Sequence, residues 1–282
     1  MPSIYVILPV YGNWADVAEC LKLLLSQTVR DFRILIADDG SPEAPPENVR
    51  VLPGYSRGEN VGFGANCNRA ARIALADGAT HLLFLNSDVT FGPRFMERWL
   101  ALAAEMPDAI LGPLIFYSQD PDRIWSSGAR RLTVFTPFVR ARERFIAITP
   151  VDTMTGCALL APAFAWERLG GFDPAFFMYY EDFDFTVRAK VQGIGTYVVP
   201  DPQVHVWHHV SGSFRGTDVW RKHELMVESS LIFIRRHYSG IRKAICLTLG
   251  VLHLLLTVVV NLPSLPAPRK LWNAVNRGYL RK

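Results

Sequence analysis

The feature that most constrains the fold of this chain is the alternation, over its first 90 residues, of short apolar runs with segments of helical period. The runs at 3–12, 32–41 and 81–89 are rich in β-branched residues and end in turn-forming residues, which indicates buried strands. Residues 15–28 carry leucines at helical spacing, and 60–78 is a glycine-rich loop that leads into an alanine-rich helix. Strands that alternate with helices predict an α/β fold with a doubly wound, mostly parallel sheet and flanking helices.

After about residue 95 the pattern is less regular. We expect further helices at 94–106 and 185–193. We expect further strands at 109–117, 153–162 and 195–200. Residues 118–150 follow no clear period and are rich in arginine and aromatic residues, so we expect an insert that is flexible or faces a bound molecule.

Charge and cysteine usage exclude several classes of protein. The formal net charge is +4 and the basic residues do not form one stripe, which argues against a nucleic-acid binder. The cysteines are far apart, and no C-x-x-C pair indicates a zinc site or a disulfide framework, so we expect a reducing cytosol. They are Cys20, Cys67, Cys157 and Cys246. The N-terminus has no basic n-region, and we expect no signal peptide.

A C-terminal apolar run predicts contact with a membrane. Residues 244–268 contain no charged side chain, and the 19 residues at 244–262 approach the ~20 that a spanning helix needs. Basic residues flank the run on both sides: Arg235, Arg236, Arg242 and Lys243 before it, and Arg269, Lys270, Arg277, Arg281 and Lys282 after it. A spanning helix is basic mainly on its cytoplasmic side, so balanced flanks favour a helix that lies on the cytoplasmic leaflet. A spanning helix and a buried core helix are the alternatives.

Polar side chains collect where the predicted strands end. Tyr11 follows the first strand, Asp38 and Asp39 end the second, and Asn86 and Asp88 end the third. Ligands of doubly wound sheets bind beyond the carboxyl ends of the strands, so this edge is the expected binding site. A single Asx-turn after a strand would explain any one of these residues.

An acidic stretch inside an aromatic one is the second candidate site. "FFMYYEDFDF" (176–185) places Glu181, Asp182 and Asp184 among six aromatic residues. Acids are favoured in the first turn of a helix, and this would account for them structurally. The alternative is a carboxylate held in a sheltered site, where it takes a proton from a substrate.

Seven segments of the chain, in their order, resemble family 2 glycosyltransferases. They are "VILPVYG", "ADDGS", "NVGFGANCNRA", "FLNSDV", "TGCALLAP", "FDPAFFMYYEDFDFTVRA" and "VWHHVSGSF". The resemblance covers roughly residues 3–235 and is strongest to the rhamnosyltransferase-like branch, which has the GT-A fold. It implies transfer of a sugar, with inversion, from a nucleotide-diphospho-sugar to a hydroxyl group, assisted by a divalent cation (Mn²⁺ or Mg²⁺).

The resemblance assigns the catalytic and metal-binding residues. Asp182 matches the family's base, and Glu181 would bind the acceptor or orient the site. Asp88 would be the carboxylate ligand of the metal, completed by His208 or, alternatively, by His209; packing and hydrogen bonding are the other explanation for these histidines. The family often has Asp-x-Asp where this chain has Asn86-Ser87-Asp88. Asn86 would therefore position the ribose or the donor sugar.

The resemblance also assigns a nucleotide site and an acceptor site. Asp39 matches the residue that hydrogen-bonds the base, and a carboxylate suits the imide N–H of uracil or thymine, so the expected donor is a dTDP- or UDP-sugar. Asp38 would instead pair with a nearby arginine. The remaining expected nucleotide-binding residues are Pro9, Tyr11, Asn60, Gly62 and Asn68, of which the glycine-rich loop members would approach phosphate. The expected acceptor-binding residues are Trp125, Tyr179 and Tyr180.

The expected organisation has three parts. Residues 1–95 form the nucleotide-sugar-binding half of a GT-A domain, 96–235 its acceptor-binding and catalytic half, and 236–282 a basic and hydrophobic membrane-associating region. The expected function is sugar transfer, with rhamnose as the best guess, to a glycan or lipid-linked acceptor in surface polysaccharide synthesis at the cytoplasmic face of the cell membrane. A non-catalytic partner of another transferase is one alternative. A sugar-phosphate nucleotidyltransferase is the other, although 9–16 lacks the lysine or arginine that it would need.

Overall fold

The computed structural model of the chain describes residues 2–130, 139–140, 144–209, 219–260, 275 and 277, with the backbone alone at 130, 139–140, 219–220 and 251–260. The helices are α1 Trp14–Leu25, α2 Glu47–Arg50, α3 Phe63–Ala76, α4 Phe95–Glu105, α5 Ala163–Leu169, α6 Glu181–Val191, α7 Val219–His237 and α8 Gly240–Val260. The strands are β1 Ile4–Val10, β2 Phe32–Asp38, β3 Tyr55–Arg57, β4 His81–Leu85, β5 Val89–Thr90, β6 Ile110–Pro113, β7 Ile115–Tyr117, β8 Asp120–Ser126, β9 Ala129–Arg130, β10 Val139–Arg140, β11 Thr149–Pro150, β12 Ala158–Pro162, β13 Thr196–Val199 and β14 Val206–His208.

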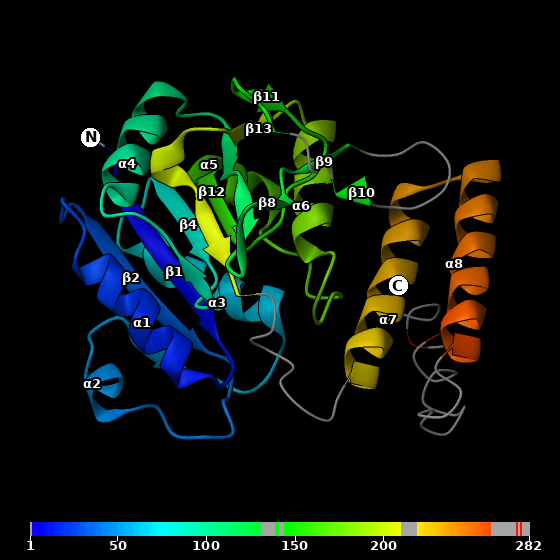
Figure 1. Cartoon of the computed structure of the whole chain (residues 1–282), viewed down its shortest axis with the longest axis horizontal. Helices are drawn as coiled ribbons and strands as arrows, with labels where there is room; N and C mark the ends of the chain where they lie inside the picture. Colours follow the sequence, from blue (N-terminus) through cyan, green and yellow to red (C-terminus); the bar gives the residue numbers. More distant parts are fainter. Residues whose placement is uncertain are drawn as a thin grey trace.

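A mixed, mostly parallel sheet forms the centre of the molecule (Figure 1). Its strand order is β11-β13-β6-β12-β4-β1-β2-β3, and β3, β2, β1 and β4 all run parallel. β12 runs antiparallel to both β4 and β6. The parallel strands therefore end at one edge of the sheet, and the antiparallel β12 begins at the same edge. A smaller sheet, β5-β14-β7-β8, carries the histidine-rich segment.

Two apolar clusters cover the two faces of the central sheet, as strand alternation requires. Along β1, Ile4, Val6 and Leu8 belong to one cluster, whereas Tyr5 and Ile7 belong to the other. α1 and α4 contribute to the first cluster, and α3, α5 and α6 to the second. The predicted α/β fold with flanking helices is thus confirmed.

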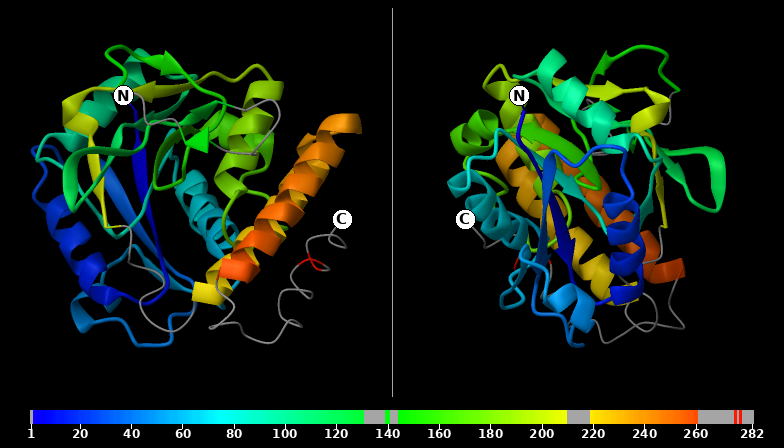
Figure 2. Two further views of the ribbon diagram at one scale, coloured as in Figure 1. Left: turned by 45° about the vertical axis from the view of Figure 1, so that its right-hand side comes forward. Right: turned by 90° about the vertical axis from the view of Figure 1, so that its left-hand side faces the viewer.

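α7 and α8 form a helical hairpin beside α6 (Figure 2). A third apolar cluster joins this hairpin to α6 and to the segment before it; its buried members are Phe176, Val187, Ile232, Phe233, Ile234, Tyr238 and Cys246. Within the described ranges, no helix is long and apolar enough to cross a membrane. Much of the predicted membrane-contacting run lies outside these ranges, because 251–260 are described by backbone alone and 261–262 are not described.

Three elements differ from the sequence-based expectation. In its described part, the expected insert at 118–150 contains the strands β8, β9, β10 and β11. β8 pairs antiparallel with β7, β9 with β10, and β11 with β13. Alternation is weak in β8 because its first four residues are exposed and only its last three are buried. α6 begins at Glu181, four residues earlier than expected, so the acidic residues lie in its first turn. The expected division at residue 95 stays a prediction; both halves contribute strands to the central sheet.

Candidate active site

The ends of β2, β1 and β4 bring the predicted polar residues to one edge. Tyr11, at the end of β1, is 50% exposed, and Pro9 is partly buried within that strand. Beyond β2, Asp38 and Asp39 are both buried but have different partners. Asp38 accepts hydrogen bonds from Ser41 N (2.8 Å) and from Tyr55 Oη (2.8 Å). Arg57 Nη1 lies 3.6 Å from Asp38 Oδ2, so this acid has the arginine partner that the sequence analysis anticipated.

Asp39 holds the glycine-rich loop with both carboxylate oxygens. Its Oδ1 accepts a hydrogen bond from Val61 N and its Oδ2 one from Gly62 N, each at 2.9 Å. Burial raises the pKa of Asp39, and these two N–H groups and the nearby Arg69 oppose that effect. Each oxygen retains a second lone pair, so the carboxylate still has acceptor capacity for a ligand.

Gly62 is the point where the loop meets the acidic segment. Its φ is +93°, and an added Cβ would lie 2.1 Å from Phe177 O. Phe63 N, the next donor along the chain, gives a 2.9 Å hydrogen bond to the same carbonyl. The predicted nucleotide-binding role of Gly62 stays a prediction. Its observed role is to let the Phe177 backbone reach the first turn of α3.

Asn68 and Asn60 differ sharply in their surroundings. Asn68 Nδ2 donates to Phe172 O at 2.7 Å, and its Oδ1 accepts from Phe172 N at 2.9 Å. Both polar groups of this amide thus bind protein backbone, and we leave Asn68 out of the proposed nucleotide site. Asn60 is exposed at the tip of the loop.

Asp88 and His208, the expected metal ligands, lie next to each other. β14 pairs with β5 so that His208 lies opposite Val89, beside Asp88. His208 Nε2 lies 3.3 Å from Asp88 Oδ1, and both side chains are largely buried. Asn86 Oδ1, on the same turn, is buried without a hydrogen-bond partner among the described residues. No group of three or more acidic, histidine or cysteine ligands occurs in the described part of the chain.

His209 and Trp125 have other neighbours. Ser118 Oγ lies 3.0 Å from Nε2 of His209, whereas His208 is the histidine beside Asp88. Trp125 was expected to contact the acceptor; it is 6% exposed, and its ring packs edge-on against His208 at 4.4 Å between centroids. In this structure Trp125 therefore supports the histidine.

Asp182 is tied to the strand end that carries Asn86. Its Oδ2 accepts a 2.7 Å hydrogen bond from Gly156 N, and its Oδ1 accepts one from Phe183 N. Cys157, which follows Gly156, accepts a hydrogen bond at its carbonyl oxygen from Asn86 N at 2.9 Å. Two adjacent residues of the loop before β12 thus connect the proposed base to the edge of the parallel strands.

Glu181 has a different environment from its neighbour. It is 4% exposed, and its Oε2 has no hydrogen-bond partner among the described residues. Burial raises the pKa of Glu181 well above its usual range, and the nearby Asp182 and Asp184 raise it further. A raised pKa favours the protonated form of Glu181, in which the carboxyl group can donate a hydrogen bond.

The backbone before α6 is strained. Tyr179 and Tyr180, both expected to contact the acceptor, have φ values of 69° and 72°. Left-handed backbone is uncommon for bulky residues, and two in succession persist only where the surrounding structure enforces them. The left-handed backbone at these two residues immediately precedes Glu181 and Asp182, the first residues of α6. Both tyrosine side chains are partly buried.

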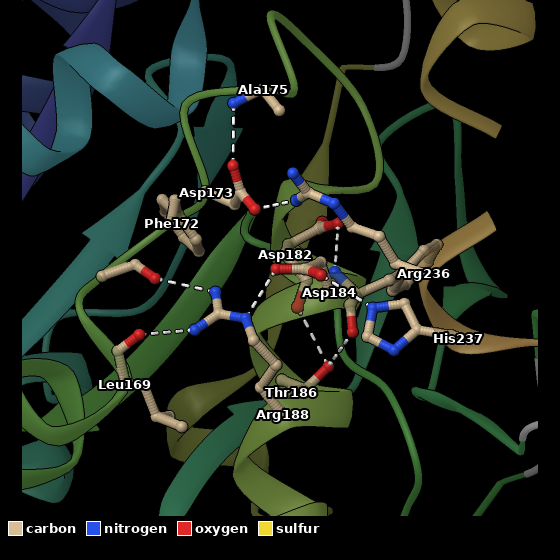
Figure 3. Close-up of polar contacts among 12 residues, drawn as sticks. Leu169, Phe172, Asp173, Ala175, Asp182, Asp184, Thr186, Arg188, Arg236 and His237 are labelled. Carbon is tan, nitrogen blue, oxygen red and sulfur yellow. Dashed lines mark hydrogen bonds and ion pairs between the residues drawn. The ribbon is translucent and has the colours of Figure 1, made fainter. Parts of the chain in front are cut away.

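The partners of Asp184 were not predicted from the sequence. Asp184 is 1% exposed and lies between Arg188 of α6 and His237 of α7 (Figure 3). Arg188 follows Asp184 by four residues, and this helical spacing is a signal for that pair. No local pattern points to His237, which lies 53 residues further along the chain.

The central α/β sheet, with polar side chains collected where its parallel strands end, is the architecture expected of a GT-A fold. Residues 5–169 match the family described as Glycosyl transferase family 2, more than half of the chain, and the chain therefore belongs to this family. It is a glycosyltransferase, so the expectation of an enzyme of this class is confirmed. The nucleotidyltransferase alternative is wrong.

Curated relatives extend over most of the chain. A Mycobacterium tuberculosis protein named N-acetylglucosaminyl-diphospho-decaprenol L-rhamnosyltransferase is 30% identical over 270 residues, which is 83% of this chain and 85% of that protein. The rhamnosyltransferase WbbL of Escherichia coli (strain K12) is 24% identical over 233 residues, which is 75% of this chain and 86% of that protein.

A solved structure shares the fold. The crystal structure of GalNAc-T7 with UDP, GalNAc and Mn²⁺ matches with a TM-score of 0.61 at 14% identity, over 83% of this chain and 48% of that one. This chain thus spans about half the length of that structure. At this identity the likeness concerns the fold.

Proposed function

We propose that this glycosyltransferase moves a sugar, with inversion, from a nucleoside-diphospho-sugar to a hydroxyl group, and that Asp182 is the general base. The observation that carries the proposal is the hydrogen bond from Gly156 N to Asp182 Oδ2 at 2.7 Å. Cys157, the residue after Gly156, is in turn hydrogen-bonded to Asn86 N. The two hydrogen bonds together connect the Asp182 carboxylate to the strand end that bears Asn86 and Asp88.

Asp182 would accept the proton of the acceptor hydroxyl while the hydroxyl oxygen attacks the anomeric carbon. The bond from that carbon to the diphosphate breaks on the opposite face, through an oxocarbenium-like transition state. The N–H groups of Gly156 and Phe183 fix the orientation of the carboxylate, one on each oxygen. A base held in one orientation loses little entropy on reaching the transition state. The protonated form of Glu181 would donate to the acceptor or to the donor sugar.

Asp88, after β4, and His208, at the end of β14, have side chains that suit a divalent cation. Asp88 and His208 would hold it, with the diphosphate and water completing its coordination, as is usual for Mg²⁺ and Mn²⁺ beside phosphates. An imidazole ligand favours Mn²⁺. The bound cation would neutralise the charge that develops on the leaving diphosphate.

The donor would be a dTDP- or UDP-sugar. Tyr11 is exposed beside the site and available to stack on a base, and Asp39 has spare acceptor capacity for an imide N–H. Oδ1 of Asn86, which has no hydrogen-bond partner among the described residues, would accept from the ribose or the sugar. Rhamnose, and an acceptor that is a glycan or a lipid-linked saccharide of surface polysaccharide synthesis, are proposed because two relatives are named as rhamnosyltransferases. We further propose that residues 236–282 contact the cytoplasmic face of the membrane.

Nucleotide release from a panel of donors tests this proposal. Purified protein is incubated with dTDP-rhamnose, UDP-sugars or GDP-sugars, Mn²⁺ or Mg²⁺, and crude lipid acceptor. We expect Asp182→Asn to lower kcat by about 10²- to 10⁴-fold with donor binding intact, since that is the usual contribution of a general base. Asp88→Ala and a chelator should abolish release, whereas Asp120→Asn, at an exposed acid, should leave it unchanged.

Several outcomes would contradict the proposal. Release that persists in Asp182→Asn removes this residue from the role of base. Release that is indifferent to both chelation and Asp88→Ala removes the cation. Donor binding without release, in the presence of every acceptor tried, favours the non-catalytic alternative.

A further inference from the structure

The C-terminal end of α7 contacts the acidic turn through a histidine, and the segment before that turn through an arginine. His237 Nε2 lies 2.7 Å from Asp184 Oδ1, within the first turn of α6 (Figure 3). The adjacent Arg236 pairs with Asp173, in the segment that leads to the turn. The Arg236 guanidinium also lies over the ring of Phe176, 5.5 Å from its centroid. Consecutive residues of one helix thus hold both ends of the segment 173–184.

Asp184 connects this contact to the rest of the domain. Its second oxygen accepts a hydrogen bond from Arg188 Nε at 2.7 Å. Arg188 in turn donates to Leu169 O (2.6 Å) and to Gly171 O (2.8 Å), at the end of α5. The Asp184 side chain is 1% exposed, and a buried carboxylate of this kind is stable only with charged or hydrogen-bonding partners. His237 is therefore part of the arrangement that fixes the first turn of α6.

Two further contacts from α7 fall on the strained part of the backbone. Ser229 Oγ donates to Met178 O at 2.7 Å, immediately before the left-handed Tyr179 and Tyr180. The ring of Tyr180 packs against Phe233 at 5.8 Å between centroids. Left-handed backbone is unfavourable for bulky aromatic residues and needs such external restraint.

We propose that the C-terminal end of α7 is a positioning device for the catalytic turn, in which His237, through Asp184, and Arg236, through Asp173, fix the direction of the Asp182 carboxylate. The inference rests on the proposed role of Asp182. His237 and Arg236 touch no reacting atom, so they are positioning residues. A misplacement of about 1 Å at a reacting group can cost 10²-fold in rate, and this is the scale on which their loss should be felt.

Replacing His237 by two amides of different length tests the proposal. The amide nitrogen of Gln reaches about as far as Nε2 of His and can donate to Asp184, whereas that of Asn is one bond shorter. We expect His237→Asn to lower kcat by about 10- to 100-fold, with the donor KM within about threefold of wild type. His237→Gln should restore kcat to within about threefold of wild type, since it supplies the donor. Met226→Ala, at an exposed residue of α7, is the control and should leave kcat unchanged.

A double variant separates positioning from general stability. If His237 acts through Asp182, Asp182→Asn/His237→Asn should be no slower than Asp182→Asn alone, because residues that act as a unit are non-additive. A merely structural loss would lower both backgrounds equally. All kcat values are taken well below the thermal midpoint of each variant. If His237→Asn does not fold, Arg236→Leu is compared with Arg236→Lys in the same assay, with the same expectations for the removed and the retained charge.

The outcomes also separate this inference from the proposed function. If the single variant Asp182→Asn is inactive but the single variant His237→Asn has the kcat of wild type, the positioning role is overturned. The proposed base is then unaffected. Equal losses in His237→Gln and His237→Asn overturn it too, because the donor then does not matter. Full activity in Asp182→Asn overturns the proposed base itself.

Discussion

At the scale of single residues, the neighbouring aspartates Asp38 and Asp39 have different hydrogen-bond partners and therefore different roles. Asp38 is saturated by Ser41, Tyr55 and Arg57, so it holds the end of β2 to its flanking segments. Asp39 faces the other way and binds the N–H groups of the glycine-rich loop. Alternation along an extended chain separates the two, and only the residue after the strand is left with acceptor capacity at the site.

Replacing Gly62 by Ala should destabilise the fold far more than the same change at Gly78. Both glycines have left-handed φ, +93° and +84°, but a Cβ at Gly62 would lie 2.1 Å from Phe177 O, whereas nothing lies within 4 Å of one at Gly78. We expect Gly78→Ala to cost about 1–2 kcal/mol from backbone strain alone. Gly62→Ala should cost about 3 kcal/mol or more because overpacking adds to that strain. Urea unfolding of both variants measures the difference, and equal costs would contradict the close approach.

The free energy of unfolding of wild type should fall relative to that of Glu181→Gln as the pH rises. Because burial raises the pKa of Glu181 in the folded protein, the unfolded chain releases this proton first, near the usual value of 4.5. The wild-type contribution is therefore complete below that pH and declines by about 1.4 kcal/mol per pH unit until the folded pKa is reached. Gln has no proton to lose, so the free energy of unfolding of the variant should exceed that of wild type increasingly above pH 4.5. Urea titrations at several pH values measure this, with the exposed Glu59→Gln as control. A constant difference would contradict the assignment.

At the scale of elements, the side-chain amide of Asn68 helps to hold α3 against the segment before α6. Asn68 satisfies both backbone groups of Phe172, and Phe172 is fully buried. Asn68→Ala would leave an N–H and a carbonyl without partners, so we expect a loss of about 2–3 kcal/mol in the free energy of unfolding. Asn60→Ala, at an exposed asparagine of the same region, should stay within about 0.5 kcal/mol of wild type. Chemical denaturation of the pair checks this, and equal losses would show that the Asn68 contact is not stabilising.

The central elements were predictable because their signals are local. Apolar runs bounded by turn residues gave the strands β1, β2 and β4, and strand ends gave the positions of Asp39, Asn86 and Asp88. β3 and α7 were not predicted: β3 has only three residues, and α7 mixes charged and apolar residues over its length. The start of α6 was missed because Tyr180, a left-handed residue, precedes it in place of a usual capping side chain.

At the scale of the whole molecule, the site could be predicted only in part from the sequence. The pairing of Asp88 with His208 follows from the motifs once β14 is known to lie beside β5. That Asn68 faces Phe172, that Trp125 packs against His208 and that His237 reaches Asp184 are contacts between distant parts of the chain. They depend on how the layers pack, and no residue pattern in one segment specifies the partner in another.

The α7–α8 hairpin gives the molecule a face on which the proposed membrane contact can be tested. On α8, Cys246 is buried against the third apolar cluster, whereas Ile241 is 78% exposed and precedes the basic Arg242 and Lys243. An exposed apolar side chain beside basic ones suits insertion into an anionic lipid surface. Val191, at the end of α6, is equally exposed, at 79%, and serves as a matched control away from α8.

We expect Ile241→Asp to weaken binding to anionic vesicles by at least about tenfold, because burying an isoleucine contributes about 1.5–3 kcal/mol and an added carboxylate is repelled by the surface. Val191→Asp introduces the same charge and should leave binding unchanged. Co-sedimentation with vesicles of neutral lipid and of lipid containing a fraction of anionic headgroups measures both variants. High salt should reduce wild-type binding, since screening weakens the attraction of Arg242 and Lys243 to the headgroups. Equal losses of binding in both variants would show that Ile241 does not make the contact. Wild-type binding that does not depend on anionic lipid would contradict the proposed membrane contact.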